Sequence, residues 1–111
     1  DITGLIRAGK MSEAVALYEK GKKSHPDWLI FEEGNMNRLG YGLMSEGKME
    51  EAIAVFKINT REYPGSFNVW DSLAEAHLKL GNKELARKYY KKSLELNPEN
   101  TNAKTMMDAM E

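Results

Sequence analysis

The sequence has no cysteine, which excludes disulfide bonds and thiolate metal sites. It also has no apolar run near the roughly 20 residues that a membrane-spanning helix needs. Neither sign of charge is in excess, because 30% of the residues are charged but the formal net charge is only −1. A general nucleic-acid binder is usually clearly basic, so we expect no nucleic-acid partner. With 41% hydrophobic residues, the 111-residue chain is expected to fold as one domain.

Proline is scarce, and its three occurrences, Pro26, Pro64 and Pro98, are regularly spaced. Three further sets of residues keep the same two offsets: Gly9, Gly47 and Gly81; Ala14, Ala52 and Ala86; Tyr18, Phe56 and Tyr90. A period in the thirties is typical of stacked helical repeats, in which each unit buries its apolar face against its neighbours. Such architectures present binding surfaces more often than they carry out chemistry.

The third unit, residues 67–100, has the clearest pattern of a helical hairpin. The i, i+3, i+4, i+7 spacing of one helix face is present at Trp70, Leu73, Ala74 and His77. Gly81 favours a left-handed helix end, and Pro98 stops the second helix. We therefore expect helices over about 67–80 and 83–96, with Trp70 in the core between them.

The first two units follow the same plan with differences in their first helices. In the first unit, residues 1–28, a helix of about 11–24 is preceded by only about two turns of helix. We therefore expect the chain to be a piece of a longer or processed protein. The second unit, residues 29–66, has four extra residues, which is close to one helical turn. Its first helix is expected to be extended, over about 27–45.

The carboxy-terminal segment, residues 101–111, has the pattern of a short capping helix. Its apolar residues are Ala103, Met106, Met107 and Met110. On one helix face these side chains would cover the exposed end of the third hairpin, as the terminal elements of repeat proteins do.

These residues resemble the tetratricopeptide-repeat family. The third unit carries the family pattern at Trp70, Leu73, Ala74, Gly81, Ala86, Tyr90 and Pro98, with His77 where the family usually has Tyr. The second unit matches at Leu39, Gly40, Gly47, Ala52, Phe56 and Pro64, and the first at Gly9, Ala14, Tyr18 and Pro26. The resemblance implies an all-α, right-handed superhelical solenoid of antiparallel helix hairpins, with about two and a half repeats and a capping helix. It also implies a non-catalytic scaffold that binds a protein or peptide.

A narrower resemblance suggests one alternative role. Short runs are similar to carboxy-terminal repeat modules of bacterial serine hydrolases of the β-lactamase-like and esterase kinds: Leu39-Gly40-Tyr41, Glu51-Ala52-Ile53, Tyr63-Pro64 and Asp71-Ser72-Leu73-Ala74-Glu75-Ala76. The chain would then be a bacterial accessory domain that packs against an attached hydrolase. A further alternative is a homodimer through the truncated first repeat, with Trp28 and Phe31 adding to the contact. The sequence favours neither the bacterial cytoplasm nor export.

No catalytic, cofactor-binding or metal-binding residues are expected. His77 aligns with Leu43 of the second unit and is therefore interpreted as a core residue. His25 and His77 do not form a metal-binding i, i+4 pair, and no serine lies in a Gly-x-Ser-x-Gly elbow. A basic cluster is interpreted as a solvated face: Lys79, Lys83, Arg87, Lys88, Lys91 and Lys92. The adjacent Tyr89–Tyr90 pair is interpreted as core and its rim.

One stripe of residues is a candidate binding surface. It lies beside the core face of the first helix in each hairpin, on the concave side where stacked repeats usually bind. Its members are Asn37, Tyr41, Met44, Asn68, Asp71, Glu75 and Leu78. Two carboxylates one helical turn apart would repel an acidic peptide, and Tyr and Met would supply apolar contact. The sequence therefore predicts a neutral or basic peptide as the partner.

Overall fold

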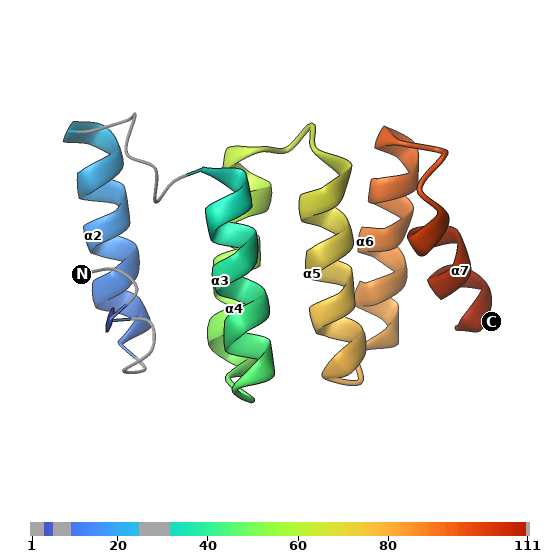
Figure 1. Cartoon of the computed structure of the whole chain (residues 1–111), viewed down its shortest axis with the longest axis horizontal. Helices are drawn as coiled ribbons and strands as arrows, with labels where there is room; N and C mark the ends of the chain where they lie inside the picture. The colour runs from blue at the N-terminus through green and yellow to red at the C-terminus, as the bar shows by residue number, and fades with distance from the viewer. Residues whose placement is uncertain (1–3, 6–9, 25–31, 111) are drawn as a thin grey trace. The chain divides into compact units, whose positions relative to one another are not determined.

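The computed structural model of the chain is all-α, and it describes residues 4–5, 10–24 and 32–110. Six helices and no strand are found in these residues: α2 (Met11–Ser24), α3 (Glu33–Ser45), α4 (Met49–Glu62), α5 (Phe67–Lys79), α6 (Lys83–Leu96) and α7 (Thr101–Ala109) (Figure 1). They make up about two and a half helical repeats. The chain divides into two compact units, residues 1–55 and 56–111.

The second helices of all three repeats begin in the same way. The amide of each alanine of the repeated column donates to the carbonyl four residues earlier: Ala14 to Lys10 at 3.0 Å, Ala52 to Lys48 at 3.0 Å, and Ala86 to Asn82 at 3.1 Å. All three alanines are at most 1% exposed. The sequence offsets therefore correspond to one repeated backbone position.

The turns within the second and third hairpins also match. Gly47 and Gly81 have φ angles of +79° and +92°, in the left-handed region that favours glycine. The Lys48 amide donates to the Leu43 carbonyl at 2.9 Å, and the Asn82 amide donates to the His77 carbonyl at 2.9 Å. Leu43 and His77 are the residues that the sequence aligns, so the turn geometry confirms this alignment.

In the first compact unit, the buried residues of α2 and of α3 each lie on one face of their helix. Ala14 and Tyr18 are buried on α2, and Met36, Gly40 and Leu43 are buried on α3. These are the positions that the helical spacing predicts for the core.

The second compact unit has a continuous core built from α5, α6 and α7. Its buried members are Ala74, Ala86, Tyr90, Ala103 and Met110, with Leu78, Tyr89, Leu94, Met106 and Met107 packed against them. Helix α6 packs against both α5 and α7, as Figure 1 shows. The carboxy-terminal helix therefore covers the third hairpin with the apolar residues that were expected.

Two expectations need correction. Helix α3 begins at Glu33, and the backbone of Glu32 is extended, with φ −69° and ψ 140°. A continuous helix over about 27–45 is therefore wrong at Glu32, while residues 27–31 lie outside the described residues. Trp70 is only partly buried, whereas its neighbour Val69 is fully buried. The indole Nε1 of Trp70 donates to the Pro64 carbonyl at 2.9 Å, so a polar contact holds this ring at the edge of the core.

Several other expectations lie outside the described residues. They concern most of the two turns of helix expected before residue 11, and the contribution of Trp28 and Phe31 to self-association.

Candidate functional site

Three residues of the candidate surface lie on one face of α5. Asp71, Glu75 and Leu78 follow one another at helical spacing, and each is partly buried, whereas Asn68 is exposed. Partial burial keeps the carboxylates within reach of a ligand and reduces their contact with water. The arrangement therefore concentrates negative charge beside an apolar side chain.

Helix α7 contacts this face directly. The Asn102 Nδ2 atom donates to both carboxylate oxygens of Asp71, at 2.9 and 3.1 Å. Burial raises the pKa of Asp71 above its ordinary value and is the largest influence on it. Hydrogen bonds from Asn102 and Asn100 lower this pKa, and the charge of Glu75 raises it. The two hydrogen bonds therefore offset only part of the free-energy cost of ionising the Asp71 carboxyl group.

A cavity of about 330 Å³ lies next to Asp71 in the second compact unit. Its walls come from α5, α6 and α7, and consist of Glu75, Leu78, Lys79, Tyr90, Asn102 and Met106. The lining combines apolar surface with one carboxylate, one amide and one ammonium group. We call this cavity, together with Asp71, the α5–α7 groove.

The α3 part of the candidate surface has the same register as the α5 part. Asn37, Tyr41 and Met44 occupy the positions one repeat before Asp71, Glu75 and Leu78, and all three are partly buried. They belong to the first compact unit, so each part of the surface is described by itself.

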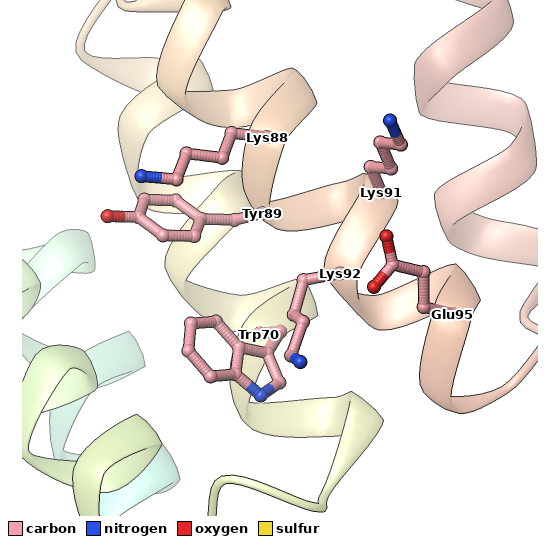
Figure 2. A pocket seen from close by; sticks show the side chains of 6 residues that line it. All are labelled: Trp70, Lys88, Tyr89, Lys91, Lys92 and Glu95. Atoms are coloured by element: carbon pink, nitrogen blue, oxygen red, sulfur yellow. The ribbon is translucent and has the colours of Figure 1, made fainter.

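A second cavity, of about 300 Å³, was not predicted from the sequence. It is lined by Trp70 of α5 and by Lys88, Tyr89, Lys91, Lys92 and Glu95 of α6 (Figure 2). We call it the aromatic–lysine pocket. The α6 residues of this lining lie on adjoining turns of the helix: Lys88, Lys91, Lys92 and Glu95. This spacing is visible in the sequence. The interpretation of these lysines as a solvated face agrees with the exposure of Lys88 and Lys91, whereas Lys92 is partly buried.

His77 is a buried core histidine, as expected. It is 5% exposed, and its ring stacks on Tyr89 with the ring centres 5.5 Å apart. Neither ring nitrogen has a hydrogen-bond partner in the described part of the chain. Burial, and secondarily the charge of Lys57, lowers the pKa of His77 below its ordinary value of 6.5. The neutral imidazole therefore serves packing.

We expect His77 to make the stability of the protein depend on pH. Because the folded-state pKa is below 6.5, the unfolded chain takes up the proton first as the pH falls. The free energy of unfolding should therefore decrease below about pH 6.5, until the pH reaches the lowered pKa. His77→Leu, which copies the buried Leu43 of the preceding repeat, should reduce this decrease.

Melting temperatures of the wild type and His77→Leu at pH 7.5 and pH 5.5 measure this effect. The His25→Gln variant measures the contribution of the other histidine separately. An equal fall in melting temperature in the wild type and His77→Leu would contradict the assignment.

The described residues contain no cluster of His, Cys, Asp or Glu that could hold a metal ion. Within the same residues, no helix is long and apolar enough to cross a membrane.

Comparison with known families supports the helical repeats. Residues 67–100 match the tetratricopeptide repeat model. Residues 2–25 and 36–58 match the PPR repeat model, which describes another helical repeat. No curated protein matches the chain. The narrower resemblance to modules of serine hydrolases therefore stays a prediction.

Proposed function

Because the chain carries helical repeats of the tetratricopeptide type, we propose that it is a non-catalytic protein-interaction module whose α5–α7 groove binds a neutral or basic peptide. Repeats of this kind bury one face between neighbouring helices and leave the other for partners. A peptide contact of its own is proposed for Asn37, Tyr41 and Met44 on α3, which occupy the matching positions in the first compact unit.

The observation that supports this proposal is the pairing of Asp71 and Glu75 beside a cavity whose lining is partly apolar. Partial withdrawal from water raises the pKa of Asp71, and the charge of Glu75 raises it further. A Lys or Arg side chain placed here would offset both effects. Leu78 and Met106, which are partly exposed, would contact the apolar part of the same peptide.

The same two carboxylates disfavour the binding of an acidic peptide. An acidic peptide would bring further carboxylates against Asp71 and Glu75, and like charges across an interface cost several kcal/mol. Lys79 lies at the groove as well, but it is exposed and can turn toward water.

The test is a fluorescence-anisotropy titration of a peptide library with members of basic, neutral and acidic composition and equal length. Basic peptides should bind most tightly, and their binding should weaken as the salt concentration rises. The double variant Asp71→Asn, Glu75→Gln keeps the shape of both side chains and should weaken this binding about fivefold or more. A control is Glu84→Gln, which removes one carboxylate, half the charge that the double variant removes, from an exposed position on α6.

Preferential binding of acidic peptides that the double variant leaves unchanged would refute the assignment of the groove. An equal loss of affinity in Glu84→Gln would show that the net charge of the chain, and not the groove, attracts the peptide.

A further inference from the structure

We propose that the aromatic–lysine pocket is a second binding site, which takes an acidic peptide segment with an apolar side chain flanked by carboxylates. This inference goes beyond the α5–α7 groove, since it concerns different side chains and the opposite charge. The pocket uses Trp70 of α5 and Tyr89 of α6. The groove lies beside the next residue of each helix, Asp71 and Tyr90.

The apolar floor of the pocket is held in place before any ligand binds. The rings of Trp70 and Tyr89 stack with their centres 5.9 Å apart and their planes 27° apart. The hydrogen bond from the Trp70 Nε1 atom to the Pro64 carbonyl fixes one ring. The other ring stacks on His77 on its inner side. A fixed floor loses little conformational freedom on binding, which favours affinity.

Both rings are nevertheless only partly buried, so the apolar surface remains accessible. Aromatic residues in this state are frequent anchors for apolar side chains of a partner. The cavity volume, about 300 Å³, is at the lower end of the range of ligand pockets and suits a side chain or two.

Positive charge surrounds this floor. The Lys88 Nζ atom lies 5.7 Å from the centre of the Tyr89 ring, and the Lys92 Nζ atom lies 5.8 Å from that of Trp70. Lys91 also lines the pocket, but Figure 2 shows its ammonium group turned away from the two rings. Glu95 is the single carboxylate in the lining.

The described part of the chain places no carboxylate within ion-pair distance of these ammonium groups, those of Lys88, Lys91 and Lys92. Contact with an aromatic ring leaves the charge of a lysine in place. A peptide carboxylate could therefore pair with one of these ammonium groups by displacing water, without breaking an ion pair within the protein. The pairing would take place next to an apolar surface.

A peptide explains these features better than a nucleic acid does. Single-stranded nucleic acids are bound by basic grooves that follow the backbone over several nucleotides. Here the lysines span little more than one turn of α6, and the whole chain has a net charge of −1. Charge complementarity over a short distance therefore favours a short acidic segment of a protein.

Four fluorescently labelled probes test the inference by anisotropy. The first is a peptide of a dozen residues, rich in Asp and Glu, with a central Phe. The second has Asn and Gln in place of the acids, the third has Gly in place of Phe, and the fourth is an oligothymidine of equal length. The first should bind at least fivefold more tightly than each of the others, and added salt should weaken it. Its binding should also shift the indole N–H resonance of Trp70 in a two-dimensional NMR spectrum.

Variants of exposed or partly exposed lysines locate the site without disturbing the fold. Lys88→Gln, Lys92→Gln should weaken binding of the first peptide at least fivefold. The matched control Lys83→Gln, Lys104→Gln removes the same charge from two exposed positions outside the pocket and should have less than a twofold effect. The groove variant Asp71→Asn, Glu75→Gln should not weaken this binding, so the failure of one site is distinguishable from that of the other.

Three results would overturn the inference. They are equal binding of the acidic peptide and its Asn/Gln counterpart, tighter binding of the oligothymidine, and an equal loss of affinity in the two lysine double variants.

Discussion

Replacing Tyr90 by alanine is expected to lower the free energy of unfolding by about 3–5 kcal/mol, the range for removing a large buried aromatic side chain. Tyr90 is fully buried, and its neighbours in the core include Ala74, Ala86 and Ala103. Alanine has no side-chain torsion that could carry atoms into the vacated space. The cavity should therefore persist, and the cost should be near the upper end of the range.

Urea unfolding followed by circular dichroism measures this loss. Tyr90→Phe keeps the ring and should lose much less than Tyr90→Ala. Tyr89→Ala removes a ring of the same size from the next position, which is only partly buried, and should also cost less. Similar losses in Tyr89→Ala and Tyr90→Ala would show that Tyr90 is not the centre of this core.

The second large effect is expected from Ser93→Ala, whose cost should be large for the removal of a single oxygen atom. The Ser93 Oγ atom donates to the Phe67 carbonyl at 2.8 Å and accepts from the Asn100 Nδ2 atom at 2.9 Å. Ser93 is fully buried and Asn100 is 8% exposed. The substitution leaves both partners without this hydrogen bond. Losing a hydrogen bond to a buried polar group costs about 1–3 kcal/mol, and Asn100 keeps its hydrogen bond to Asp71, so the free energy of unfolding should fall by about 2 kcal/mol.

The effect of Ser93→Ala should extend to α7. The Asn100 Oδ1 atom accepts from the Ala103 amide at 3.4 Å and so caps the start of this helix. Amide hydrogen exchange should therefore become faster in α7, whereas Ser45→Ala, at an exposed position, should leave it unchanged. Ser93→Ala and Asn100→Ala should be non-additive in a double-mutant cycle. Additive losses would contradict a shared network.

The sequence predicted most helix bounds because strong local signals mark them. The helix expected over 83–96 is found at Lys83–Leu96, between the positive-φ Gly81 and Pro98. The start of α3 was predicted less well. A shift of four residues fits an added helical turn, but the extended backbone of Glu32 excludes a continuous helix, and the nearest glycine, Gly34, lies inside α3 and does not mark its start.

The site residues were harder to predict because their contacts join distant parts of the chain. Asp71 was expected to be a groove carboxylate, but its hydrogen bonds to Asn102 span 31 residues and depend on how α7 packs. The position of Trp70 depends on a hydrogen bond to the Pro64 carbonyl, which periodicity does not reveal. The pocket beside it arises from side-chain contacts between α5 and α6.

The matched glycine turns show that one backbone turn can join the two helices in repeats of different sequence. The same left-handed glycine and the same closing hydrogen bond at 2.9 Å occur in two successive repeats, whereas the residues around each glycine differ. Glu46 precedes one glycine, and Leu80, which is 53% exposed, precedes the other. The backbone of the turn thus tolerates either an acid or a hydrocarbon at this place. Evolution can therefore vary the surface chemistry of each repeat there without changing how its two helices are joined.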